Sequence, residues 1–211
     1  MSEKQTPYYQ ADTEQLILRA AEREFIDKGF ESARTTTIAE DAGVTHAMLH
    51  YYFRTKEKLF DTVLSTKVSE MRRVMLGFID NEELPLLRRI ELGVRRHFEF
   101  LMNNPQLPLF IINELRRKDS KVAKFMEISK DTANDIQASL QSAIDVAASK
   151  GECRRMDART LMLDIISLNV APFVGAPLID CIFAIGPEKR HEFLPERLEE
   201  NVKTILNKLQ P

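Results

Sequence analysis

The sequence has little of the cysteine that marks disulfide-rich or metal-binding proteins, with two cysteines in 211 residues. It also has no tryptophan. Cys153 and Cys181 lie far apart and match no metal-ligand spacing, which favours reduced thiols in a cytoplasmic protein over a disulfide scaffold or a metal site. Residues 1–10 lack an apolar core, so we expect no signal peptide. With seven glycines and nine prolines, the chain has room for long helices.

An excess of positive charge is also missing. The formal net charge is −2, and residues 1–60 hold eight basic against ten acidic side chains, so composition alone predicts no nucleic-acid partner. Between residues 43 and 58, however, three basic side chains stand against one acidic one, a net of +2. Because a small DNA-binding domain needs a basic face rather than a basic average, this local charge keeps that function open.

The most apolar stretch, from Leu161 to Ile185, is long enough to span a membrane. It is interrupted by charged or polar side chains and prolines, which are costly in lipid. The interruptions are Asp164, Asn169, Pro172, Pro177 and Asp180. We therefore expect a buried pair of helices and no membrane partner.

Residues 35–53 have the pattern of two short helices joined at Gly43. Apolar residues of the first half recur with the spacing of one helix face, and a glycine adopts at no steric cost the left-handed conformation that ends such a helix. The Thr45 hydroxyl is placed to cap the second helix, whose inward residues are Leu49 and Phe53. This is the helix-turn-helix pattern, in which the second helix enters the major groove of DNA.

This region resembles the DNA-binding domain of the TetR family of one-component transcriptional repressors. The matching run is Ile38-Ala39-x-x-Ala42-Gly43-Val44-Thr45, then Leu49-x-Tyr51-Tyr52-Phe53-x-x-Lys56-Glu57-x-Leu59-Phe60, within a similarity from Thr13 to Phe60. The resemblance implies a three-helix DNA-binding domain at residues 1–55 and a helical ligand-sensing and dimerisation domain at residues 56–211. It also implies a homodimer that binds a double-stranded DNA operator and responds to a small-molecule inducer of unknown identity. In the family, the segments that correspond to Leu161–Ile185 and Leu194–Leu209 form a four-helix dimer interface.

The other segments predict helices throughout. Apolar residues recur with helical spacing over residues 56–79, 86–101, 122–147 and 194–209, and no stretch alternates with the period of a strand. A first helix is expected from Asp12, ending at Gly29. Its expected inner face is Leu16, Ile17, Ala20, Ala21 and Phe25. The sequence therefore predicts an all-α fold, in which a helical bundle follows the N-terminal domain.

The DNA-binding residues are predicted from their places around the turn. Side chains at the start of the first short helix and on the outer side of the second are placed to contact phosphates and base edges. The predicted residues are Arg34, Thr35, Thr36, Thr45, His46, Ala47, His50, Tyr51, Tyr52 and Lys56. In the resembling family, the positions of Tyr51 and Lys56 contact the DNA backbone.

Three positions depart from the family pattern, which often has Lys or Arg at His46, Gly at Ala47 and Tyr at His50. Because histidine is mostly neutral at pH 7, His46 and His50 supply less attraction to phosphate than lysine would. We therefore predict weaker electrostatic affinity that tightens at mildly acidic pH. Operator titrations that show no change between about pH 6 and pH 8 would remove this hypothesis.

His46 and His50 also have the i, i+4 spacing of two metal ligands on one helix face. The glutamate of a metalloprotease motif is missing because position 47 is alanine, and no third ligand is near in sequence. We therefore predict no metal site and no cofactor.

A ligand pocket is predicted in the second domain. The resemblance implies a bundle that encloses an inducer, and polar groups among aromatic and methionine side chains would orient it. The predicted residues are His97, Phe98, Phe110, Asn113, Met126, Ser129, Asn169 and Phe173. The alternative for His97 is a hydrogen-bonded core histidine, and for the apolar residues it is ordinary core packing.

The function that the sequence favours most is a ligand-responsive DNA-binding transcriptional regulator. Because members of the resembling family usually repress transcription, we expect a repressor, with activation left open. One alternative is an all-α small-molecule binding protein whose N-terminal helices mediate protein contacts. An all-α enzyme would need a clustered acid/base pair or a nucleophile motif, and the sequence shows neither. The chain is therefore predicted not to be an enzyme.

Overall fold

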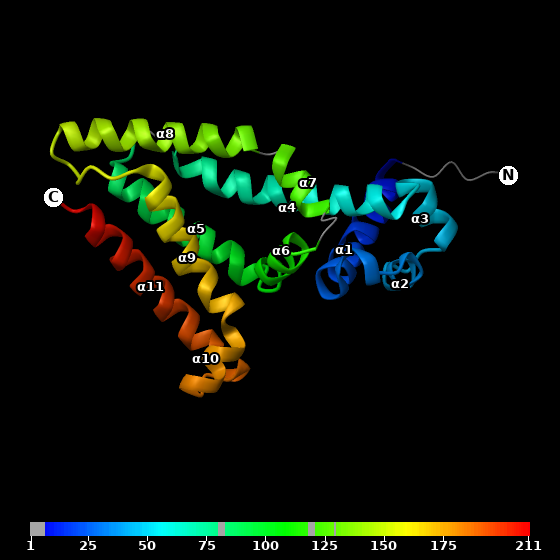
Figure 1. Cartoon of the computed structure of the whole chain (residues 1–211). Coiled ribbons are helices and arrows are strands. Elements are labelled where there is room, and N and C mark those ends of the chain that lie inside the picture. Colours follow the sequence, from blue (N-terminus) through cyan, green and yellow to red (C-terminus); the bar gives the residue numbers. More distant parts are fainter. Residues whose placement is uncertain (1–6, 80–82, 118–120, 129) are drawn as a thin grey trace. The chain divides into compact units, whose positions relative to one another are not determined.

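The computed structural model describes residues 7–79, 83–117, 121–128 and 130–211, and every regular element among them is helical (Figure 1). This confirms the all-α prediction. The helices are α1 (Pro7–Ser32), α2 (Thr35–Asp41), α3 (His46–Phe53), α4 (Lys56–Ile79), α5 (Leu86–Asn103), α6 (Leu107–Leu115), α7 (Lys121–Ile128), α8 (Lys130–Ser149), α9 (Ala158–Val174), α10 (Ala176–Phe183), the 3-10 turn η1 (Pro187–Lys189) and α11 (Arg190–Leu209).

The chain divides into two compact units. Unit 1 comprises residues 1–69 and 110–125, and unit 2 comprises residues 70–109 and 126–211. This division differs from the predicted boundary after residue 55, because the first turns of α4 and most of α6 pack with the N-terminal helices. The functional boundary at residue 55 stays a prediction.

Unit 1 is built around an aromatic cluster. The ring of Phe60 lies 5.0 Å from that of Phe25 and 5.0 Å from that of Phe30, both at steep interplanar angles. Phe110 of α6 completes the cluster, with its ring 6.3 Å from that of Phe60. Edge-to-face pairs of this kind add to the stabilisation that burial of the rings provides. A residue of α6 is therefore part of the core on which the DNA-binding helices rest.

Helix α1 differs from the expected helix at both ends. It begins at Pro7 rather than Asp12, and its backbone leaves helical geometry at Gly29 (φ 74°, ψ 168°) before it ends at Ser32. Four of the five expected inner residues are buried, but Leu16 is 49% exposed, so its assignment to the core was wrong. A stripe of helical spacing predicts which residues share a face, but not how wide the covered part of that face is.

Replacing Gly29 by alanine is expected to lower the free energy of unfolding by about 1–2 kcal/mol, because this backbone conformation strains any residue with a Cβ. A Cβ there would also lie 2.8 Å from Oε1 of the buried Glu114. Urea denaturation of Gly29→Ala, alone and combined with Glu114→Ala, separates the two causes. If removal of Glu114 restored full stability, the backbone strain would be excluded as the main cause.

Unit 2 is a bundle in which α5, α9 and α11 pack against one another, and α8 covers α5 and α9 (Figure 1). Helix α5 is strongly amphipathic, and one face of α11 is buried as the sequence predicted. The segment predicted to be helical over residues 122–147 is helical at every described residue, in α7 and α8, and residue 129 between them lies outside the described residues.

The apolar stretch 161–185 is only partly buried within the single chain, and its burial against a second copy stays a prediction. It forms α9 and α10 as a pair, but none of the eight residues of α10 is buried. Leu178, Ile182 and Phe183 are 63%, 61% and 67% exposed. Among the described residues no single helix has the length and apolarity to cross a membrane; α9 and α10 meet that test only when taken together, and they are bent by 68°.

Candidate nucleic-acid interface

The turn between α2 and α3 has the geometry that the sequence predicted. Gly43 has a φ of 68°, in the left-handed region. Its N–H donates to the Glu40 oxygen (3.0 Å), and the Val44 N–H donates to the Ala39 oxygen (3.0 Å). These two bonds form a Schellman motif, which satisfies carbonyl groups that the end of a helix leaves free. The motif fixes the direction in which the chain enters α3.

Helix α3 is anchored on one side and open on the other. The Thr45 hydroxyl accepts from the Met48 N–H (3.2 Å), which confirms its role as N-cap. Leu49 and Phe53 are buried at 1% and 3% exposure. The opposite side consists of exposed side chains. They are His46, Ala47, His50 and Tyr51.

The exposed side chains of α3 are held by contacts with one another and with α2. Nε2 of His46 lies 3.0 Å from the Thr35 hydroxyl, which connects the start of α3 to the start of α2. The rings of His46 and His50 meet edge to face at 4.5 Å, and Nδ1 of His50 lies 3.0 Å from the Arg54 backbone oxygen. No group of three potential metal ligands occurs within the described ranges of the chain.

The start of α2 is positioned by a buried carboxylate of α1. Oε1 of Glu24 accepts the Arg34 backbone N–H (3.0 Å), and Oε2 accepts from Lys28 (2.8 Å). Burial of Glu24 by itself raises its pKa, but the bonds from Lys28 and Arg34 outweigh this and hold the pKa below its ordinary value. The carboxylate is therefore ionised at neutral pH. Nothing in the sequence pattern singled out Glu24.

Replacing Glu24 by leucine is expected to weaken operator binding about tenfold, because the Arg34 N–H loses a charged acceptor worth about 1–2 kcal/mol. Glu24→Gln is the matched control, since its amide oxygen keeps an acceptor at nearly the same place. Fluorescence anisotropy on labelled operator DNA measures both variants. Equal losses in the two variants would show that the bond to Arg34 does not position α2.

Two predicted phosphate contacts have partners within unit 1. Lys56 donates to the Glu31 backbone oxygen (3.0 Å) and lies 4.8 Å from the ring centre of Phe30. Tyr52 is half-buried, and its ring meets the 70% exposed Tyr51 at 5.4 Å. The Arg34 and Thr36 side chains are exposed, and Thr35 is half-buried. The DNA contacts of all these residues stay predictions.

The predicted ligand residues are divided between the two units. In unit 2, Asn169 lies 3.2 Å from Nδ1 of His97, and the rings of Phe98 and Phe173 lie 5.4 Å apart. Phe110 and Asn113 belong to unit 1, and Met126 is 42% exposed. Ser129 lies outside the described residues. Their ligand contacts stay predictions.

The pair of His97 and Asn169 is part of a buried polar chain. Asn169 donates to the Val94 oxygen (2.9 Å) and accepts from Asn201 (3.0 Å), which joins α5, α9 and α11. His97 is 4% exposed, and burial lowers its pKa to about 4. The polar side chains that helical spacing placed on apolar faces are thus connected to each other.

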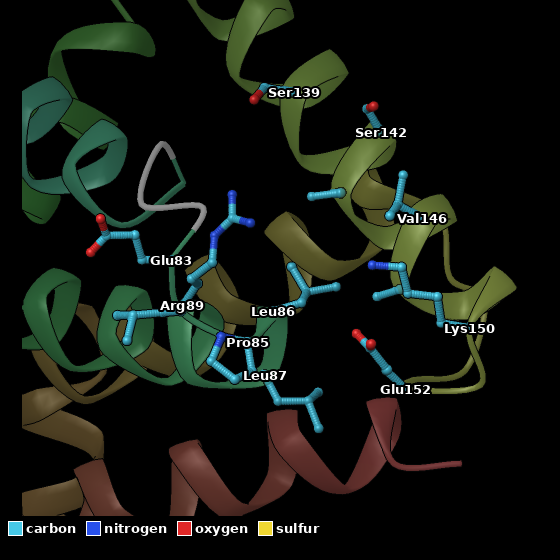
Figure 2. Close-up of a pocket in the computed structure, with 13 residues that line it drawn as sticks. Glu83, Pro85, Leu86, Leu87, Arg89, Ser139, Ser142, Val146, Lys150 and Glu152 are labelled. Atoms are coloured by element: carbon cyan, nitrogen blue, oxygen red, sulfur yellow. The ribbon is translucent and has the colours of Figure 1, made fainter.

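Among the hollows that the described residues line, a larger and a smaller one lie in unit 2, and none of the predicted ligand residues lines either of these two. The larger, of about 840 Å³, lies between the start of α5 and the side of α8 (Figure 2). Its lining combines apolar residues, such as Leu86 and Val146, with charged side chains of both signs. These are Glu83, Arg89, Lys150 and Glu152. The smaller, of about 470 Å³, is mainly apolar and is lined by residues of α9, α10 and α11, among them Arg197, and by Ile185. The sequence pattern did not indicate the larger hollow, because its residues come from separate helices and the segments beside them.

The capped turn and the open side of α3 define unit 1 as a helix-turn-helix DNA-binding domain. The family model described as "Bacterial regulatory proteins, tetR family" matches residues 17–63. Residues 17–63 therefore form a DNA-binding domain of the TetR family of transcriptional regulators.

Proteins similar to the chain over most of its length are regulators. The HTH-type transcriptional repressor BepR of Brucella suis biovar 1 (strain 1330) is 25% identical over 67% of this chain and 69% of that protein. The fatty acid metabolism regulator protein of Bacillus subtilis (strain 168) is 24% identical over 82% and 87%. The structure of FadR from Bacillus subtilis in complex with stearoyl-CoA has a TM-score of 0.64 at 16% identity, over 92% and 98% of the two chains.

Proposed function

We propose that this protein is a homodimeric repressor that leaves its DNA operator when a small molecule binds to unit 2. The observation that carries this proposal is the division of α3 into two sides. Leu49 and Phe53 fix its apolar side in the core, while His46, His50 and Tyr51 stay exposed on the other. A helix presented in this way is suited to enter a major groove.

In the proposed complex, some residues around the turn contact phosphates and others contact base edges. Arg34, Thr35 and Thr36 contact phosphates on one side of the groove, and Tyr51, Tyr52 and Lys56 contact them on the other. Base edges are read by Thr45, His46, Ala47 and His50. Two copies of α3 in a two-fold dimer must lie about 34 Å apart to enter successive major grooves.

Release of the protein from its operator follows from a difference in the ligand's affinity for two conformers of the protein. Helix α4 runs through both units, since residues 56–69 belong to unit 1 and residues 70–79 to unit 2. A ligand that binds more tightly to a conformer with a different α3 spacing lowers operator affinity by the difference between its two binding free energies. Ligand binding then weakens operator binding, and operator binding weakens ligand binding by the same factor.

We propose a long-chain acyl thioester as the effector class. Support comes from the two similar regulators whose names refer to fatty acid metabolism or stearoyl-CoA. It also comes from the 840 Å³ hollow, which has the size of a ligand pocket and apolar walls. Two basic side chains, Arg89 and Lys150, line it beside the acidic Glu83 and Glu152.

Anisotropy titrations with stearoyl-CoA, stearate and coenzyme A, each added to the protein–DNA complex, test the effector class. Release by stearoyl-CoA alone supports it, and release by none of the three contradicts it. Lys150→Ala should weaken the response to stearoyl-CoA, whereas Lys130→Ala, at an exposed lysine at the start of α8 outside the hollow, should not.

A gel shift with the DNA upstream of the protein's own gene separates the repressor from an all-α binding protein whose N-terminal helices contact other proteins. A retarded band that a random duplex does not compete away supports the repressor. We further propose that the protein acts by binding alone, without catalysis, and in the cytoplasm, where its DNA partner lies.

A further inference from the structure

The imidazole of His50 has a defined protonation pattern. Its Nδ1 lies 3.0 Å from the backbone oxygen of Arg54, a carbonyl that accepts hydrogen bonds and has no proton to donate. Nδ1 must therefore carry the proton. In a neutral imidazole the other nitrogen, Nε2, is then a bare acceptor.

The backbone around Arg54 makes this arrangement specific. Arg54 ends α3 with a φ of 57°, an uncommon value outside glycine, and its own N–H donates to the His50 oxygen (3.0 Å). Residues 50 and 54 are thus joined by two hydrogen bonds, one through the ring and one through the backbone. His46 differs, because its Nε2 contacts a hydroxyl, which donates or accepts equally well.

An acceptor on the outer side of α3 has few partners on duplex DNA. Phosphate oxygens, guanine N7 and O6, and thymine O4 are all acceptors and cannot bond to it. The donors in the major groove are the exocyclic amino groups of adenine and cytosine. We infer that His50 selects adenine or cytosine, through its Nε2, at one base pair of each operator half-site.

This inference rests on the proposed function, and it assigns His50 to base reading rather than to phosphate attraction. The first test is ¹⁵N NMR of the histidine-labelled, DNA-free protein. A proton on Nδ1 of His50 supports the inference, and a proton on Nε2 alone overturns it.

The second test is selection of duplexes from a random library at about pH 7.5, where histidine is mostly neutral, by the full-length protein and its variants. The wild type should enrich adenine or cytosine at one position per half-site. His50→Ala should lose this preference about tenfold while the other positions keep theirs. His50→Lys, which has donors only, should prefer guanine there. His191→Ala, at an exposed histidine of α11, is the matched control and should keep the preference.

The outcomes distinguish this inference from the function on which it rests. If the wild type enriches no sequence, the proposed function fails. If it enriches an operator but His50→Ala weakens all sequences equally, His50 contacts the backbone and the inference is overturned. An unchanged base profile in His50→Ala overturns it as well.

Discussion

Operator affinity should fall about a thousandfold when His46 and Tyr51 are both replaced by alanine. Both side chains are exposed on the open side of α3, and neither contributes to the core. A direct contact to a base edge or phosphate is worth about 1 kcal/mol, and the proposed dimer makes each contact twice. Four lost contacts therefore cost about 4 kcal/mol, which is about a thousandfold in the dissociation constant.

The same double variant should keep its helix content and its dimer in size-exclusion chromatography. His191→Ala, at an exposed histidine of α11, is the matched control. Its operator affinity should stay within about threefold of the wild type, as expected for a surface change outside the DNA contacts. Loss of the dimer in the double variant would instead mean that the two side chains are structural.

The free energy of unfolding should fall by about 3 kcal/mol on acidification from pH 7 to pH 4, through His97 alone. Burial lowers the pKa of His97 to about 4 in the folded protein, whereas histidine in an unfolded chain titrates near 6.5. Between these values the unfolded chain binds more protons than the folded protein, so stability rises with pH. The stabilisation is complete above about pH 6.5 and is lost as the pH falls toward 4.

Urea denaturation of the wild type and His97→Gln at a series of pH values isolates this contribution. Because carboxylates titrate in the same range, the relevant quantity is the difference between the two proteins at each pH. Glutamine keeps an acceptor for Asn169 and has no titratable group. His191→Gln, at a histidine that is 75% exposed, should follow the wild type. Parallel curves for the wild type and His97→Gln would contradict the burial effect.

The helix-turn-helix could be predicted in detail because its determinants are local. Gly43 ends α2, Thr45 caps α3, and Leu49 and Phe53 face the core, each for a reason contained within a few neighbouring residues. The structure confirms all of these assignments. Steric limits on φ and the capping of free N–H groups depend little on the remainder of the chain.

Features that depend on distant parts of the chain were not predictable. Glu24 acts on Arg34 across a turn, and the chain from His97 through Asn169 to Asn201 joins three helices. Periodicity assigns a residue to a face, but it does not show which polar groups meet there. For the same reason, the apolar composition of α10 predicts that it is covered, but not whether the same chain or a second copy covers it.

Hydroxyl-radical footprinting of the full-length protein on the DNA upstream of its gene tests the central claim most directly. The claim is that two copies of α3 enter successive major grooves of one duplex with their exposed sides. The account predicts two protected segments related by a two-fold axis, with centres about 10 base pairs apart, and their loss in the His46→Ala, Tyr51→Ala variant. One protected segment, or protection that the double variant retains, would contradict it.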